Sequence, residues 1–341
     1  MRRITPAARK RLAILGFLLL LPVATMIIGC IMPGRSYQGP WVPLSKEEAL
    51  LKDALRRDVE HLAGTIGERS VEQYAGFMAA KGFLESSLRG AGYEARLQEY
   101  EVSGKACFNI EAEIRGKDRP KEIVVIGAHY DSVEGCPAAN DNGTGTAAVL
   151  ALARVFAGAA TSRTLRFVCF ANEEPPRFTT ELMGSRVYAR RCRERKEDIV
   201  AMLSLETIGW YSDEKESQKY PFPFSLVYPS TGNFIGFVGN LSSYGLVRKT
   251  VRSFRAHTQF PSEGVATWSK IPGIGWSDHW SFWQEGYDAV MVTDTAPFRY
   301  PHYHMASDTP DKIRYEPFAR VVSGLRNVVE DLAGPVVFKA K

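Results

Sequence analysis

A continuous apolar run, Ile123-Val124-Val125-Ile126-Gly127-Ala128, constrains the fold of this chain more than any other segment. A strand that is apolar at every position is typical of a sheet covered by helices on both faces. Comparable runs occupy residues 164–171 and 201–206, and segments with helical apolar spacing, 146–157 and 186–197, lie between and after them. This alternation predicts an α/β fold: a three-layer sandwich with a mostly parallel central sheet.

Further elements are expected on both sides of this region. Ser70, with Gln73 three residues later, resembles a capping box that starts a helix, and Gly90 and Gly92 end it. The other expected helices span 46–66, 242–257, 278–285 and 318–333, and the other expected strands span 95–102, 109–114, 224–228 and 289–292.

The first 33 residues form a segment of their own. Five basic residues within positions 2–11 precede an uncharged, mostly apolar run that is long enough to cross a bilayer. We expect a signal sequence, a retained anchor or, because Ile27-Ile28-Gly29-Cys30 resembles a lipobox, a signal that ends in a lipidated Cys30. In each case the chain is tethered to or directed through a membrane, with the rest on the periplasmic or outer-surface side. Residues 34–45, rich in Pro and Gly, are expected to be a linker, and residues 46–341 one folded domain.

The charge balance and the cysteines narrow the possible classes of protein further. Apart from the basic residues of the first segment, basic and acidic residues balance at 38 each. A balanced body argues against nucleic-acid binding, which needs clustered Lys and Arg. If Cys30 carries lipid, the other four cysteines allow three pairings. Cys169 lies inside a buried strand and is expected to stay a free thiol, which leaves Cys107–Cys136 as the preferred disulfide.

Metal-binding residue types stand where the buried strands end. His129 and Asp131 follow the first strand, Glu173 and Glu174 follow the second, and Glu206 ends the third. Because carboxyl ends of parallel strands share one edge of the sheet, we expect these side chains to meet. Adjacent buried glutamates are costly without a cation beside them.

Two more segments supply candidates for the same site. Asp141 stands in a turn that opens the helix at 146–157, and the cluster Tyr300-Pro301-His302-Tyr303-His304 follows the last short strand. Carboxylates and imidazoles together suit zinc, with cobalt or manganese as substitutes. Asp141 could bridge two ions, and Asp131 could orient the imidazole of His129.

Five segments carry a resemblance to a known family: GAHYDSV, AANDNGTG, FANEEPP, SLETIGW and YHMASDTPDKI. In order and spacing they resemble the metal-site motifs of the di-zinc exopeptidases, clan MH. The branch that includes bacterial leucyl aminopeptidases, aminopeptidase Y and glutamate carboxypeptidase II is the most similar. The resemblance covers about residues 120–315, and SDHWSFWQEG also matches the family's stretch before the last strand.

The resemblance implies a role for each residue of the motifs. Asp141 bridges two zinc ions, His129 and Glu206 complete one site, and Glu174 and His304 complete the other. Glu173 corresponds to the general base that moves a proton from the attacking water to the leaving amine. Tyr303 is similar to a tyrosine that donates to the tetrahedral intermediate, with a packing role as the alternative.

Residues beside the motifs are assigned supporting roles. Asp278 and His279 are placed in a supporting shell or substrate wall, and His302 is expected to be structural. The loops 210–232 and 264–275 contain Trp210, Tyr211 and Trp268, and Trp276 follows them directly; this aromatic bulk either shapes a side-chain pocket or packs at the surface.

The sequence therefore predicts a membrane-tethered zinc exopeptidase that acts on peptides, most simply an aminopeptidase, and leaves its oligomeric state open. Three alternatives remain: a carboxypeptidase of the same clan, a single-zinc glutaminyl cyclase, and a binding protein without catalysis. An oxidoreductase is disfavoured because the Gly-Thr-Gly-Thr-Ala-Ala pattern at 143–148 does not follow its strand directly. Serine hydrolase and His-Glu-x-x-His protease motifs do not occur in the sequence.

Overall fold

The computed structural model describes residue 10 and residues 25–338. The greater part of the apolar N-terminal run therefore lies outside the described residues. Within the described part of the chain, no helix is long and apolar enough to cross a membrane.

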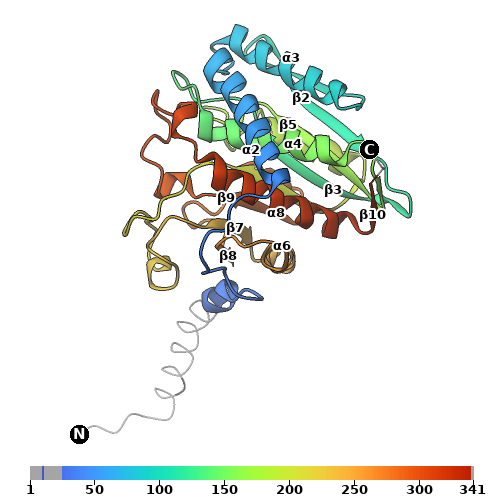
Figure 1. The fold of residues 1–341 in the computed structure, drawn as a ribbon. Coiled ribbons are helices and arrows are strands. Elements are labelled where there is room, and N and C mark those ends of the chain that lie inside the picture. The colour runs from blue at the N-terminus through green and yellow to red at the C-terminus, as the bar shows by residue number, and fades with distance from the viewer. Residues whose placement is uncertain (1–9, 11–24, 339–341) are drawn as a thin grey trace, which may run out of the picture.

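An eight-stranded sheet forms the centre of the molecule, in the order β1-β2-β5-β3-β6-β9-β7-β8 (Figure 1). The strands are β1 (Arg96–Val102), β2 (Lys105–Ile114), β3 (Arg119–His129), β5 (Arg163–Phe170), β6 (Asp198–Glu206), β7 (Ile235–Asn240), β8 (Ser262–Thr267) and β9 (Ala289–Thr293). The central strands β5, β3, β6 and β9 are parallel, whereas β2 and β7 run antiparallel to their neighbours β5 and β9. A separate pair joins β4 (Ala160–Thr161) to β10 (Val336–Val337).

Helices cover both faces of this sheet. The helices are α2 (Lys46–Val59), α3 (Tyr74–Gly90), α4 (Gly145–Phe156), α5 (Gly184–Glu194), α6 (Tyr244–His257), α7 (His279–Gln284) and α8 (Tyr315–Ala333). Short π-helical segments span Glu60–Ile66 and Ala139–Thr144, and 3₁₀ turns span Phe224–Leu226, Ala296–Phe298 and Pro310–Lys312. Helices α2, α3, α4, α6 and α8, which are labelled in Figure 1, contribute to one large core. Helices α5 and α7 pack on the other face of the sheet.

The continuous apolar run in β3 is explained by these two layers. Val124, Ile126 and Ala128 belong to the larger core, while Ile123 and Val125 belong to the core under α5 and α7. The predicted three-layer α/β sandwich is thus confirmed, because a strand covered twice needs apolar side chains at every position.

Some details differ from the expectation. Residues 224–228 do not form a strand but begin with the 3₁₀ turn Phe224–Leu226, in which Phe224 N and Leu226 N donate to the local carbonyls of Pro221 and Pro223 instead of to a neighbouring strand. Strands β7 and β8 were not expected from the sequence, since glycines interrupt their short apolar patterns. Ser70 accepts a hydrogen bond from Gln73 N, but regular helix begins only at Tyr74.

The predicted Cys107–Cys136 disulfide is wrong, since all five cysteines are free thiols. Cys107 lies on β2 in the larger core. Cys136 lies in the loop after β3, where its Sγ donates to Met305 O at 2.9 Å. The two cysteines thus have different neighbours in the fold.

The segment before α2 lies against the domain instead of extending freely from it. Residues 25–30 are helical, and residues 31–45 have no regular secondary structure. Arg248 of α6 donates to Ile31 O at 2.6 Å, and Arg255 donates to Pro33 O at 3.1 Å. Ser36 Oγ accepts from Ser262 N at 2.9 Å, so this segment is fastened to α6 and to the outermost strand, β8.

Candidate metal centre and adjoining pocket

The residues predicted to bind metal converge at the carboxyl ends of β3, β5 and β6. Asp141 lies between two imidazoles: its Oδ1 is 3.4 Å from His129 Nε2, and its Oδ2 is 3.1 Å from His304 Nε2. Glu206 Oε2 lies 3.3 Å from His129 Nε2, and Glu174 Oε2 lies 3.3 Å from His304 Nε2. One carboxylate therefore joins two groups of donors, His129 with Glu206 and His304 with Glu174.

Glu173 lies at the same cluster without belonging to either group. Its Oε2 is 3.8 Å from His129 Nε2, and the side chain is buried. His129 and the other carboxylates are also buried, and His304 is partly exposed. The cluster thus opens to solvent on the side of His304.

The local charges favour a bound cation. Burial, and then the neighbouring Asp141, raise the pKa of Glu174 to about 8. Burial also raises the pKa of Glu173, although His129 opposes the shift and Glu174 adds to it. Burial acts to raise the pKa of Asp141 as well, but the imidazoles of His129 and His304 outweigh it and hold that pKa low. The buried carboxylates therefore repel one another when they are ionised, and a bound divalent ion would offset this repulsion.

Unpartnered atoms point to the same conclusion. Within the described residues, neither ring nitrogen of His129 has a hydrogen-bond partner, nor has Glu174 Oε1. Ligand atoms of His129, Asp141 and Glu206 lie within 4.8 Å of one another, as do those of Asp141, Glu174 and His304. Imidazole and carboxylate donors at these separations fit the zinc chemistry expected from the sequence.

Asp131 fixes the backbone of Glu173 and Glu174, two residues that come shortly after β5, toward the site. Its Oδ1 accepts from Glu173 N at 3.0 Å, its Oδ2 accepts from Glu174 N at 3.1 Å, and Oδ1 also lies 3.4 Å from His129 Nδ1. The predicted orientation of His129 by Asp131 stays a prediction, since the two side chains are close but His129 Nδ1 has no hydrogen-bond partner among the described residues. The clamp on both glutamates was not anticipated.

Asp308 fixes the backbone around Asp141 in the same way, and this role was not expected from the sequence. Asp308 Oδ1 accepts from Asn140 N at 2.9 Å, and its Oδ2 accepts from Asp141 N at 3.1 Å. Tyr300 also donates to Asp308 Oδ1 at 2.7 Å. Asp308 stands in the segment YHMASDTPDKI, so its presence beside His304 in the sequence was the available signal.

Two further residues fix the loop that carries Asp141. Asn142 Oδ1 accepts from Gly145 N and from Thr207 N at 2.9 and 3.1 Å, which ties the loop to the end of β6. A Cβ on Gly145 would lie 2.2 Å from Leu205 O, so only glycine permits this approach. Arg69, fully buried, donates to Tyr130 O at 2.8 Å and to Pro137 O at 2.7 Å, and so holds the chain before the loop.

The other predicted site residues lie around the cluster. The Tyr303 ring stacks on that of His304 with centroids 3.9 Å apart, and burial, followed by Asp141 and other carboxylates, raises the pKa of its hydroxyl. Asp278 and His279 are buried, and His279 Nε2 bonds to Ile274 O at 2.7 Å. His302 lies outside the cluster, with its Nδ1 2.9 Å from Ser307 Oγ.

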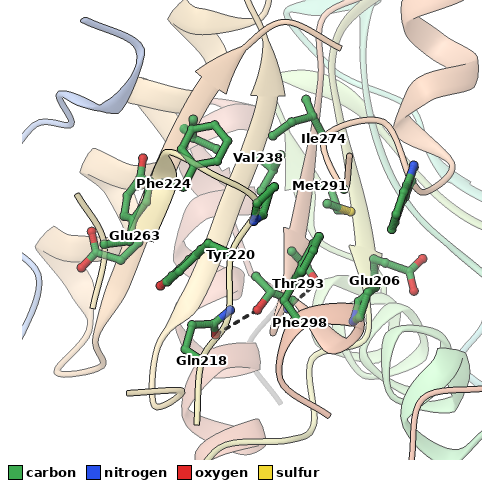
Figure 2. A pocket seen from close by; sticks show the side chains of 18 of the residues that line it. Glu206, Gln218, Tyr220, Phe224, Val238, Glu263, Ile274, Met291, Thr293 and Phe298 are labelled. Atoms are coloured by element: carbon green, nitrogen blue, oxygen red, sulfur yellow. Dashed lines mark hydrogen bonds between the residues drawn. The ribbon is translucent and has the colours of Figure 1, made fainter. Parts of the chain in front are cut away.

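An apolar cavity of about 800 Å³, including its part open to solvent, adjoins the cluster and shares Glu206 and Tyr303 with it (Figure 2). The floor of the cavity consists of residues of β7, β8 and β9, and the register of these strands decides which of them are neighbours. Val238 of β7 lies between Met291 of β9 and Val265 of β8, and Gly236 lies between Thr293 and Glu263. Gly236 has no side chain, so the floor has a narrow gap there, in which an added Cβ would lie 3.3 Å from Thr293 O and 3.6 Å from Thr295 Cγ2. The cavity continues across β7 to Glu263 (Figure 2).

Loops cover this floor. Tyr220, Phe224 and Tyr228 come from the expected loop 210–232, and Ile274 and Trp276 come from the other side. Of the other aromatic residues expected near a pocket, Tyr211 packs against Phe260, Trp210 packs against Tyr300, and Trp268 is exposed. Pocket lining and packing, the two alternatives, therefore both occur.

An eight-stranded α/β sandwich with imidazoles and carboxylates gathered at its strand ends defines a metal-dependent hydrolase. The model of Peptidase family M28 matches residues 109–329 of the sequence, and the chain belongs to this family. The family relation confirms the predicted metallopeptidase class.

Individual proteins agree with this assignment. The chain is 32% identical over 307 residues to the uncharacterised protein YfbL of Escherichia coli K12, covering 86% of this chain and 93% of that protein. It is 27% identical to a probable leucine aminopeptidase of Arthroderma otae, covering 78% of this chain and 68% of the relative. A solved zinc aminopeptidase of Bacillus subtilis, 15% identical, superposes with a TM-score of 0.65 over 82% of this chain and 95% of its own, which supports the fold.

Proposed function

We propose that this protein is an aminopeptidase that uses two zinc ions to hydrolyse the first peptide bond of a peptide. The position of Asp141 carries the proposal, because its two oxygens face two separate groups of metal ligands. Aminopeptidases among the curated relatives support the choice of the amino end over the carboxyl end.

The proposed ligands follow the two groups. His129 and Glu206 would hold one ion, Glu174 and His304 would hold the other, and Asp141, whose two oxygens face the two pairs, would serve both. When bound, the ions lower the pKa of a shared water and polarise the scissile carbonyl. Cobalt and manganese are expected to substitute for zinc, since they accept the same donors.

Glu173 is the proposed general base. Its carboxylate is buried beside His129, and its backbone is fixed by Asp131, so it can take a proton and pass it to the leaving amine without moving away. Its raised pKa suits an acid that must give up the proton again. Tyr303 is the proposed donor to the tetrahedral oxyanion, because burial keeps its hydroxyl protonated.

A peptide mixture tests the proposal. The full chain, in detergent and loaded with zinc, is incubated with defined peptides that have free or acetylated amino ends, and products are followed by mass spectrometry. We expect single residues to be lost from free amino ends only, and a chelator or Glu173→Gln to abolish the loss.

The same experiment separates the alternatives. Trimming from carboxyl ends would make the chain a carboxypeptidase and overturn the specificity. Loss of ammonia from amino-terminal Gln would show a glutaminyl cyclase, a class whose Fimbriiglobus ruber member shares the fold with a TM-score of 0.62 at 21% identity. No product with zinc bound would indicate a binding protein.

We also propose that the N-terminal segment tethers the enzyme to a membrane with the peptidase domain on the extracytoplasmic side. The basic residues at positions 2–11 and the uncharged run after them support this orientation. An alkaline phosphatase fused after the last residue should be active in cells, whereas a cytoplasmic domain would leave it inactive.

A further inference from the structure

Two segments that are far apart in the sequence pack side by side near β8. Met26 and Cys30, from the helical residues 25–30, contact the same apolar cluster as Tyr220 and Tyr228, and Phe224 is buried within it. Met26 and Cys30 are four residues apart and so lie on the same side of their helical turn. The helical residues 25–30 and the loop 221–228 thus pack on the same apolar cluster.

The opposite sides of both segments are apolar and exposed. Phe222 is 81% exposed and Leu226 is 76% exposed, values that few large apolar side chains of this protein reach. The exposed apolar face consists of Ile27, Ile28, Ile31, Phe222, Leu226 and Val227. Large apolar side chains that stay exposed on two segments packed on the same cluster mark an interaction surface.

The chain that precedes this face identifies the partner. Residues 12–24 contain no charged residue and continue the apolar sequence directly into Met26. The face therefore lies where this uncharged run reaches the described part of the chain. A second protein would not require an apolar run of this length beside the contact.

We propose that the face formed by Ile27, Ile28, Ile31, Phe222, Leu226 and Val227 lies in the surface of a lipid bilayer. The loop 221–228 then makes a second membrane contact in addition to the N-terminal tether, on which this inference rests. Phe222 and Leu226 enter the region between headgroups and acyl chains, roughly 5–10 Å deep, as apolar faces of interfacial segments do. Because Phe224 and Tyr228 of this loop line the cavity, one wall of the pocket is held at the membrane.

The test measures how close the loop is to lipid in the full chain. Leu226→Cys is labelled with bimane and reconstituted in vesicles of phosphatidylethanolamine and phosphatidylglycerol, with or without brominated acyl chains. Leu97→Cys is the matched control, since Leu97 is exposed on β1 at the other edge of the sheet. Labelled wild type measures the background from Cys30, the native cysteine that is not fully buried.

We expect brominated lipid to quench bimane at position 226 and to shift its emission to the blue, with no change at position 97. Equal, solvent-like emission at both positions in chains that float with the vesicles would overturn the lipid contact. Protection of position 226 from aqueous iodide without quenching by brominated lipid would also overturn it and would indicate contact between two copies.

Flotation of the chain with vesicles tests the membrane tether, the proposal on which this inference rests. Chains that do not float with vesicles overturn both the tether and the lipid face. Neither outcome depends on catalysis, because the peptide mixture tests the peptidase activity independently.

Discussion

Over β3, β5 and β6 the edge of the sheet carries buried carboxylates and imidazoles, whereas over β9, β7 and β8 it carries an apolar cavity. In the first region directional contacts fix the backbone that carries the charged side chains, such as those of Asp131 and Asp308 with backbone N–H groups. In the second region the shape depends on strand register and on one missing side chain, Gly236. We therefore expect the first region to carry the chemistry and the second to select a substrate side chain.

This comparison predicts that substitutions in the two regions have separable effects. In the metal region they should change turnover or zinc binding for all substrates alike. In the cavity they should change the ranking of substrates and leave zinc binding intact.

The largest effect is expected for Glu173→Gln. The amide cannot accept a proton, so kcat should fall by about 10²–10⁴, the contribution typical of a general base. Zinc content, measured by atomic emission, should stay at the wild-type level. Glu174→Gln is the matched control, since it removes a proposed ligand and should lower zinc content. Near-normal turnover of zinc-loaded Glu173→Gln would show that the base is assigned to the wrong residue.

Removal of zinc should destabilise the whole domain. Without the ions the carboxylates of the cluster repel one another in a buried place. A ligand present at about 1,000 times its Kd stabilises the folded state by about 4 kcal/mol. The melting temperature should therefore fall on the order of 10 °C with chelator and recover with zinc. An unchanged melting temperature after verified loss of zinc would contradict this view of the cluster.

Asp308→Asn should weaken the metal region through Asp141. The amide keeps one acceptor, but its NH₂ group then faces the N–H of Asn140 or Asp141, which loosens the bridging carboxylate. We expect zinc affinity to fall by about 10–100-fold, as for other groups that orient metal ligands. Asp311→Asn, exposed on the same segment, should match wild type in a zinc competition titration. Equal affinities of both variants would argue against this role.

Gly236→Val should produce the smallest effect and the most selective one. The valine side chain projects into the gap in the cavity floor, so peptides with a large first side chain should lose about tenfold in kcat/KM, within the range for hydrophobic pockets. Peptides that begin with Ala should be nearly unaffected, and zinc content should not change. Parallel assays with leucyl and alanyl 4-nitroanilides give the comparison. The cavity would not be the side-chain pocket if both substrates lost activity equally.

The same contrast explains what the sequence could predict. The strands that end at or just before His129, Glu173 and Glu206 are mostly apolar, so their ends and the metal-binding residues could be located. The cavity depends on β7 and β8, whose pattern is interrupted by Gly236, Gly239 and Gly264, and its shape depends on which strands become neighbours. Side-chain identity alone does not contain that tertiary information.

Asp308 shows the same limit within the metal region. A carboxylate in a polar segment is ordinarily solvated, and only the folded loop brings it to the backbone of Asn140 and Asp141. The predicted disulfide failed for a related reason. The sequence contains the cysteines, but the fold gives Cys136 a carbonyl partner far from Cys107 in sequence.

The gap at Gly236 also has a genetic consequence. All glycine codons begin with GG, so a single change of the second nucleotide gives Ala, Val, Asp or Glu at this position. The valine and acidic replacements would partly fill the cavity floor without touching any proposed zinc ligand. If Gly236→Val changes substrate preference as expected, a single nucleotide change is enough to alter that preference while the proposed zinc ligands stay the same.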